Sequence, residues 1–289
     1  MKPWTICVAA GILSFSPLGV FGEILKTAML EEVNTRVEKI AKTVPAREIL
    51  VIYDVDQTLA RPADPALQVT NLRHHRETLR KLFTGLTPRQ VESVKLLAIA
   101  KTPHVLLDDG VAEKIANLQK SGVPAFALSS LPCGALPGEK GQRPFYAIQA
   151  GRLTELGIHF EKAFTFRRVF LQSFSKRDGC VPTYYNGVLL SNGESNGTVL
   201  AALLKNCKTL PQHIVAVDSD VSHLKDISKA LHKQFPKIHF TGLEYVSTAT
   251  DEVKTLSDEE FIAFWKPFVE RVKKLDIGVA PKLQKQRGK

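Results

Sequence analysis

Cysteine is scarce in this sequence, with four among 289 residues. Cys7 lies in the apolar start of the chain, and Cys133, Cys180 and Cys207 follow at wide intervals. No two have the CxxC spacing and none stands at zinc-finger distance from a histidine, which excludes an ordinary structural zinc site. The three later cysteines allow at most one intramolecular disulfide, and we expect them to be small core residues.

Long apolar runs are absent beyond the start of the chain, so we expect a soluble mature protein without a membrane span. The start itself has the layout of a secretory signal: Lys2, an almost uncharged run over 4–21, and the small Gly22 before the first acid. The alternative is a retained anchor, but Pro17 interrupts a run that would need about 20 continuous apolar residues. We expect residues 1–22 to be cleaved and the protein to be exported to the periplasm, the outer envelope or the medium.

Acidic residues are outnumbered, with 29 Asp plus Glu against 39 Lys plus Arg and a formal charge of +10. Such a surface attracts anions, including phosphorylated substrates and acidic lipid headgroups, although solubility alone explains most of these charges. No RNA-binding, zinc-finger or helix-turn-helix signature accompanies them, so we expect no specific nucleic-acid partner. Peripheral association with anionic surfaces is a further possibility.

The pattern of apolar residues predicts an α/β fold. Uninterrupted apolar runs predict strands buried on both faces at 49–53, 124–128 and 214–217, with further strands at 163–172, 185–190 and 238–243. Spacings of three and four predict helices at 23–44, 110–121, 144–156, 199–205, 224–235 and 257–272. Strands that alternate with helices favour a doubly wound parallel sheet.

Residues 61–105 interrupt this alternation. After a loop with two prolines, 71–83 reads as a basic helix, whose face with His75 is expected to be solvated or, alternatively, to meet an anionic substrate. Thr87-Pro88-Arg89-Gln90 is a capping box that predicts a second helix to about Ala100. We therefore expect a small helical cap at 61–105, a core at 23–60 and 106–275, and a basic tail at 276–289.

Polar residues follow three of the predicted strands. Their sequences are Asp54-Val55-Asp56-Gln57-Thr58, Ser129-Ser130 and Asp218-Ser219-Asp220. Ligands of open parallel sheets bind outside the carboxyl ends of the strands, so we expect these side chains to meet at one edge. An Asp-x-Asp pair alone is often only turn chemistry, but the two other strand ends favour a functional site.

These residue types suit phosphoryl transfer. Asp54 can attack phosphorus as a carboxylate nucleophile, and Asp56 can protonate the leaving oxygen and later activate water. Magnesium would offset the repulsion between the two carboxylates, with Asp218 as a further oxygen ligand. Ser129 can donate a hydrogen bond to the phosphoryl oxygens.

An apolar run before DVDQTL, a strand ending in serine and a strand ending in DSD together resemble the haloacid dehalogenase superfamily over about 49–243. The signal-like start, the helical insertion and the helix before the sheet resemble more specifically an uncharacterised exported subfamily from intracellular Gram-negative bacteria. The resemblance implies a haloacid-dehalogenase-like core with a cap and a phosphatase chemistry. The acid at position 56 argues against a dehalogenase and against a pumping ATPase of that superfamily, because both carry another residue type at this position.

The resemblance also implies roles for single residues. Asp54 matches the nucleophile, which binds the metal as well; Asp56 matches the acid/base, which binds metal through its carbonyl oxygen. Ser129 matches the second motif, and Asp218 the metal-binding acid of the fourth. The remaining candidates, which would contact substrate, are Thr58, Ser130, Asn196 and Gly197.

Two departures from the superfamily pattern stand out. Where related exported members are expected to carry Lys-Gly, this sequence has Asn196-Gly197, and asparagine brings no charge to a phosphate. Lys205 lies at the far end of that helix, so the cations that could substitute are Lys176, Arg177 and Lys225. In the fourth motif Ser219 separates two acids that are usually adjacent, so the second acid is either displaced or absent.

The sequence therefore supports two hypotheses. In the first, the protein is an exported Mg²⁺-dependent phosphohydrolase that acts on a small phosphomonoester through an aspartyl phosphate at Asp54. In the second, it is a catalytically degenerate member that serves as a secreted or envelope binding protein, because it lacks the cation expected at Asn196.

Overall fold

The computed structural model describes residues 22–136, 143–160, 163–246 and 254–275. The expected signal peptide, except for Gly22, and the basic tail lie outside these residues. No helix in the described ranges has the length and apolar character that crossing a bilayer requires.

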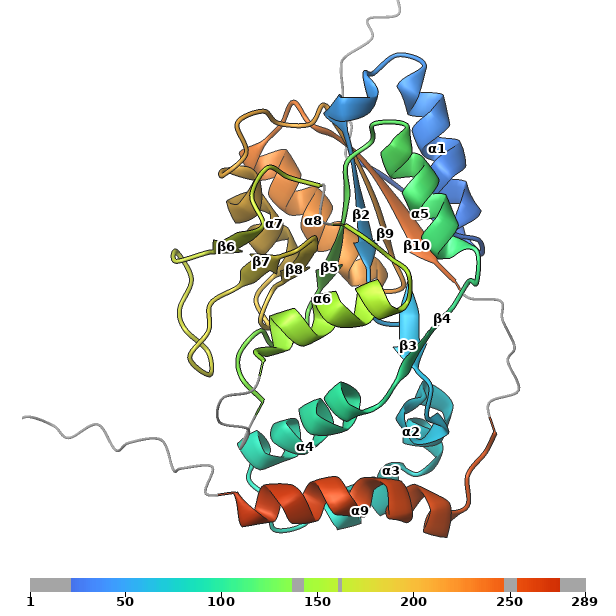
Figure 1. Cartoon of the computed structure of the whole chain (residues 1–289), viewed down its shortest axis with the longest axis vertical. Coiled ribbons are helices and arrows are strands. Elements are labelled where there is room, and N and C mark those ends of the chain that lie inside the picture. The colour runs from blue at the N-terminus through green and yellow to red at the C-terminus, as the bar shows by residue number, and fades with distance from the viewer. Residues whose placement is uncertain (1–21, 137–142, 161–162, 247–253, 276–289) are drawn as a thin grey trace, which may run out of the picture.

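A central sheet organises the molecule (Figure 1). In the described residues it has eight strands in the order β1-β10-β9-β2-β5-β8-β7-β6. The first six in this order run parallel: β1 (Glu23–Thr27), β10 (His239–Tyr245), β9 (His213–Asp218), β2 (Ile49–Asp54), β5 (Ala125–Ser129) and β8 (Val188–Leu190). The sequence-based expectation of an α/β fold with a mostly parallel sheet is thus confirmed.

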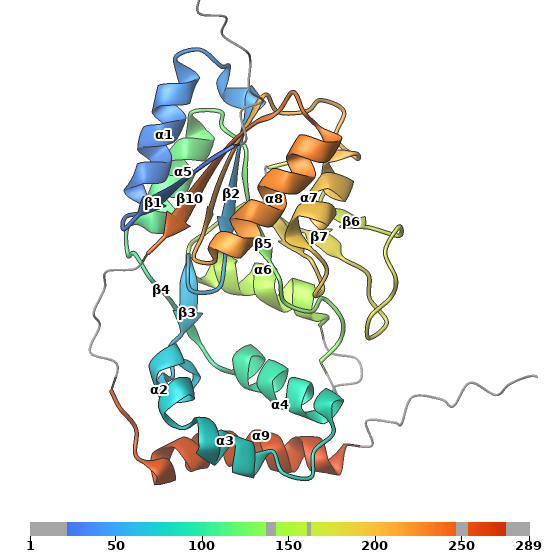
Figure 2. The same ribbon diagram turned by 180° about the vertical axis from the view of Figure 1, so that it is seen from behind.

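Helices cover both faces of the sheet, which explains why its central strands are apolar throughout. Alternate residues of β2 point to opposite faces: Val51 and Tyr53 pack on the side of α1 (Glu31–Ala41), α5 (Val111–Lys120) and α6 (Phe145–Glu155). Leu50 and Ile52 pack on the side of α7 (Asn196–Leu204) and α8 (Val221–Gln234). Figures 1 and 2 show these two layers from opposite sides.

Three sequence predictions about the elements were wrong. Residues 23–44 are not one helix, because 23–27 pair with β10 as the edge strand β1 before α1 begins. The segment 163–172 contributes only the short strand β6 (Arg168–Phe170). The segment 185–190 belongs to a hairpin of β7 (Thr183–Tyr185) and β8, which turns at Asn186-Gly187, both with positive φ. β7 therefore runs antiparallel to β8, and β6 pairs antiparallel with β7.

The insertion after β2 forms a helical cap on a two-stranded stalk. β3 (Ala60–Pro62) and β4 (His104–Leu106) pair antiparallel and were not predicted. Between them lie the short helix η2 (Pro65–Leu67), α2 (Val69–His74), α3 (Arg76–Leu82) and α4 (Pro88–Lys101). The capping box expected at Thr87 is present, since its hydroxyl and the side chain of Gln90 cap each other's backbone.

The last described helix, α9 (Asp258–Lys274), completes the cap. It packs against α3 and α4 (Figure 2), although the sequence analysis had grouped it with the core. An apolar stripe predicts that a helix face is buried, but not against which partner. His75, expected on a solvated face, is buried, lies 2.8 Å from Asp258 Oδ1 through Nδ1, and stacks on Phe261.

Candidate active site

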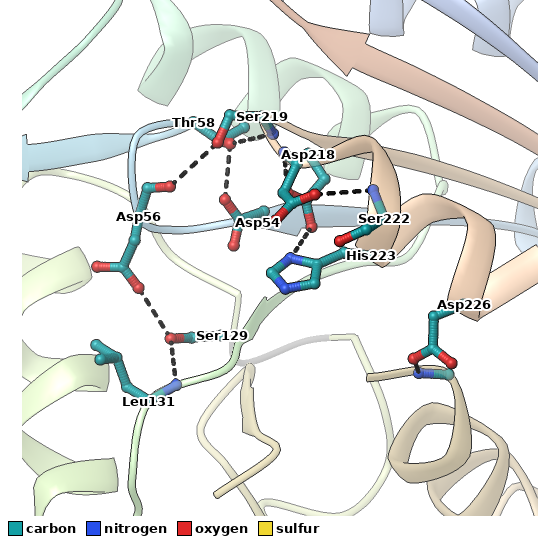
Figure 3. A network of polar contacts seen from close by, with 12 residues as sticks. Asp54, Asp56, Thr58, Ser129, Leu131, Asp218, Ser219, Ser222, His223 and Asp226 are labelled. Carbon is teal, nitrogen blue, oxygen red and sulfur yellow. Dashed lines mark hydrogen bonds and ion pairs between the residues drawn. The ribbon is translucent and has the colours of Figure 1, made fainter. Parts of the chain in front are cut away.

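The carboxyl ends of three neighbouring strands bring the sequence-predicted residues together. Asp54 ends β2, Ser129 ends β5 and Asp218 ends β9, and β2 lies between the other two strands. The buried side chains of Asp54 and Asp218, more than 160 positions apart in the sequence, therefore lie close enough for their charges to interact (Figure 3). This juxtaposition is the central expectation of the sequence analysis.

The turn after β2 fixes the position of Asp54. Gln57 adopts a positive φ of 63°, and the turn returns Thr58 above the strand end. The Thr58 hydroxyl donates to Asp54 Oδ2 at 2.7 Å and accepts from the backbone N–H of Ser219 at 3.0 Å. Thr58 is fully buried, so it links the β2 and β9 loops and orients Asp54.

Asp54 sits in a strongly unfavourable place for a negative charge. Burial raises the pKa of its carboxyl well above the usual range, and the charges of Asp218 and Asp56 raise it further. The hydrogen bonds from Thr58 and from the backbone at Val55 oppose this rise. The clustered carboxyls therefore favour the binding of a cation that offsets their charge.

Asp56 is held by Ser129. The Ser129 hydroxyl donates to Asp56 Oδ2 at 3.0 Å and accepts from the backbone N–H of Leu131 at 3.3 Å. Loss of surrounding water raises the pKa of Asp56, while the Ser129 bond and the charge of Arg152 lower it. Ser129 thus positions Asp56 in this structure, and would have to turn away from it to donate to a phosphate.

Asp218 is paired with a histidine that the sequence analysis missed. Its Oδ2 lies 3.1 Å from Nδ1 of His223 in the first turn of α8, and its Oδ1 accepts from the backbone N–H of Asp220. The bond to Asp218 raises the pKa of His223. Asp220 accepts from the N–H of Ser222 and caps α8, so it is not a second acid facing the cluster.

Arg152 is a second residue that sequence motifs did not mark. It lies buried on α6 and donates to the carbonyl oxygens of Ile99 at 3.0 Å and Ala100 at 3.5 Å, near the end of α4, and to the side chain of Gln149. Its charge lowers the pKa of Asp56. The sequence did hold one indication of this residue, because Gln149 and Arg152 are two polar residues three positions apart on the face of α6 that is buried.

The cations proposed from sequence lie elsewhere. Arg177 Nη2 pairs with Glu92 of α4 at 2.5 Å. Lys176, Lys205 and Lys225 are exposed. The basic side chains near these carboxyls are instead Arg152, whose charge acts on Asp56, and the partly buried His223, which pairs with Asp218.

Asn196 and Gly197 open α7, but this helix end faces α8. Asp226 accepts from the N–H of Gly197 at 2.8 Å and from the hydroxyl of Ser195, and in Figure 3 it stands apart from Asp54 and Asp56. The buried side chain of Asn196 makes no hydrogen bond within the described residues. The remaining substrate candidate, Ser130, is exposed beside Ser129.

Gly197 is required by packing, and we expect Gly197→Ala to destabilise the fold. A Cβ at this position would lie 2.3 Å from the carbonyl oxygen of Asp226 and 2.9 Å from the Cβ of Ala230. Relieving such overlap between α7 and α8 costs about 1–3 kcal/mol. Urea unfolding would measure it, with Gly151→Ala as control because a Cβ there meets open space. Equal stability of both variants would contradict the assigned contact.

Oxygen ligands at this edge suit magnesium. Within the described residues no three His, Cys, Asp or Glu side chains gather as a metal-binding group. Magnesium needs fewer, since it takes one or two carboxylates and completes its shell with waters and phosphate oxygens. The buried, mutually repelling Asp54 and Asp218 fit that requirement.

Comparison with known proteins gives a family but no activity. No curated protein matches the chain. A family model described as "Protein of unknown function (DUF2608)" matches residues 26–272, which include the cap, α9 up to Val272 and the sheet apart from the first three residues of β1. The chain therefore belongs to the DUF2608 family.

Proposed function

We propose that this protein is an exported Mg²⁺-dependent phosphohydrolase with a haloacid-dehalogenase-like core, acting on a small phosphomonoester through an aspartyl phosphate. The observation that carries the proposal is the meeting of Asp54, Asp56 and Asp218 at adjacent strand ends. Both carboxyls have raised pKa values in the metal-free protein, and a cation bound by Asp54 and Asp218 would favour the charged form of Asp54 over that of Asp56. Pairs of acids whose environments differ in this way suit nucleophile and acid/base roles.

The carboxylates of Asp54 and Asp218 and the backbone carbonyl of Asp56 would hold magnesium. The ion would supply positive charge that neutralises a phosphate oxygen. Asp56 O is within 3.5 Å of the Ser219 hydroxyl, which ties this carbonyl to the β9 loop that carries Asp218. The three oxygens therefore come from two loops that are bonded to each other through Thr58 and Ser219.

The side chains divide the chemistry as follows. Asp54 attacks phosphorus, with Thr58 holding its second carboxylate oxygen. Asp56, whose raised pKa favours the protonated form, gives its proton to the leaving oxygen and then accepts one from the attacking water. Ser129 keeps Asp56 aimed, and the exposed Ser130 is left for the substrate.

A binding protein without turnover is the second candidate. It is favoured by Asn196, which brings no cation and whose helix end is capped by Asp226. Phosphate release from a generic aryl phosphate, measured with and without magnesium, separates the two. Turnover that requires both magnesium and Asp54 supports the enzyme. Saturable phosphate binding with no turnover, unchanged by Asp54→Asn, supports the binding protein.

Magnesium is expected to stabilise the protein through Asp54 and Asp218. At about 100 times its dissociation constant, a ligand bound only by the folded state contributes about 2.7 kcal/mol. For a chain of this size that corresponds to a rise in melting temperature of roughly 5–10 °C. Thermal unfolding of the wild type, Asp218→Asn and the exposed control Asp109→Asn would test it. The rise should vanish only in Asp218→Asn; a rise of equal size in all three would place the ion elsewhere.

A further inference from the structure

Two of the three described cysteines face each other. Cys133 follows β5 in the segment that begins with Ser129, and Cys180 ends a tight turn before β7. Both thiols donate to the same oxygen, the carbonyl of Val181, at 2.8 Å from Cys133 and 3.3 Å from Cys180. Each sulfur also shifts the pKa of the other, as expected for two thiols that lie close together. Cys207 packs in the apolar cluster on the other face of the sheet.

A single buried asparagine sets the backbones of both cysteines. Oδ1 of Asn192 accepts from the N–H of Cys133 at 3.1 Å, and its Nδ2 donates to the carbonyl of Cys180 at 2.9 Å. Asn192 itself is fixed by a bond from its N–H to the carbonyl of Leu131. Disulfides need a short, defined separation of the two backbones, and Asn192 imposes one before any bond forms.

We propose that Cys133 and Cys180 form a disulfide by exchange with an external disulfide. Cys180 attacks one sulfur of the donor RSSR, giving a mixed disulfide and RS⁻. Cys133 then attacks the sulfur of Cys180 and releases a second RS⁻, and the protons of the two cysteines protonate the two leaving thiolates. The protein loses two hydrogens and the donor is reduced to two RSH.

The environments of the two sulfurs divide these roles. Cys180 is partly exposed, so an external disulfide can reach it, and its interaction with Cys133 lowers its pKa, which favours the thiolate. Cys133 is fully buried, and its interaction with Cys180 together with its burial raises its pKa. The accessible thiolate therefore meets the donor, and the buried thiol resolves the mixed disulfide.

The crosslink would also join the active-site segment to the cap. The turn that Cys180 ends carries Arg177 and Asp178, which pair with Glu92 at 2.5 Å and Arg89 at 2.8 Å on α4. Oxidation therefore fixes the Ser129 segment to the turn that contacts the cap helix. The disulfide stands on the cysteine geometry alone and does not depend on the proposed phosphatase activity.

The test uses the full chain carrying Cys7→Ser, reduced and then exposed to oxidised glutathione. Thiol titration of the unfolded product is expected to fall from three to one, with peptide mapping showing a Cys133–Cys180 link and a mass loss of two hydrogens. The melting temperature of the oxidised form should rise by roughly 5–10 °C and return on reduction, because the bridge closes a long loop.

Matched variants make the outcome decisive. A further Cys207→Ala substitution should leave the link unchanged, whereas a further Cys180→Ala substitution should abolish it and leave two thiols, neither joined to the other. Three thiols that persist in the parent protein would overturn the proposal. So would a link that contains Cys207. The thiol titration and the peptide mapping use protein without substrate or magnesium, so their outcome is independent of any result on phosphate release.

Discussion

Asp54→Asn is expected to abolish phosphate release and, at the same time, to stabilise the metal-free fold. Loss of the nucleophile should lower turnover at least about 10³-fold. The gain in stability follows from the raised pKa of Asp54, because ionising this buried carboxyl beside Asp218 and Asp56 costs folding free energy. Asparagine keeps an oxygen for the Thr58 hydroxyl and carries no charge, so we expect a gain on the order of 1–3 kcal/mol at neutral pH.

The dependence of this gain on pH has a definite sign. A carboxyl whose pKa is raised on folding contributes stability that is fully present below its unfolded pKa, about 3.9, and is lost as pH rises through its folded pKa. The difference between variant and wild type should therefore be small near pH 4 and grow toward neutrality. Urea unfolding over this range would measure it, with Asp109→Asn as the exposed control. A variant less stable than wild type at pH 7 without metal would refute the charge assignment.

Arg152→Met is expected to weaken the fold and shift the pH dependence of turnover. The substitution removes the donor to the carbonyls of Ile99 and Ala100 and the charge that acts on Asp56. Leaving buried acceptors unpaired should cost about 2–4 kcal/mol in unfolding free energy. Without the guanidinium the pKa of Asp56 rises, so an activity that needs protonated Asp56 should extend to higher pH.

Arg152→Lys is the matched control for this prediction. Lysine keeps the positive charge but not the planar donor pair, so the alkaline limb of the pH profile should stay near that of wild type while part of the stability is lost. Denaturant unfolding and the pH profile of kcat together separate the two effects. An alkaline limb that moves equally in both variants would show that Arg152 acts on Asp56 through structure and not through charge.

The parts of the fold that could be read from sequence are those that a local pattern determines. The runs at 49–53 and 214–217 lie within β2 and β9. Four or five successive apolar residues in a strand point to both faces of the sheet, so such a run predicts a strand that is buried on both faces. Asp54 and Asp218 could be paired in advance because neighbouring parallel strands end at one edge. Their meeting needed no knowledge of side-chain contacts.

The parts that could not be read depend on partners distant in sequence. The edge strand β1 has a helix-like spacing that its pairing with β10 overrides. Gly197 was expected to contact substrate, but its amide donates to Asp226, 29 positions later in the sequence. Arg152 and His223 belong to no sequence motif, and only the tertiary structure places Arg152 near Asp56 and His223 beside Asp218.

The docking of α9 also has a consequence for how the chain reaches its native state. Asn71 of α2, fully buried, bonds to the backbones of Lys254 and Leu256, 183 and 185 positions away. During synthesis at about 5–20 residues per second, Asn71 is made roughly 10–40 s before Lys254 and Leu256. For that interval the apolar residues of α3 and α4 that pack against α9 stay exposed, so we expect chaperones to bind the nascent chain.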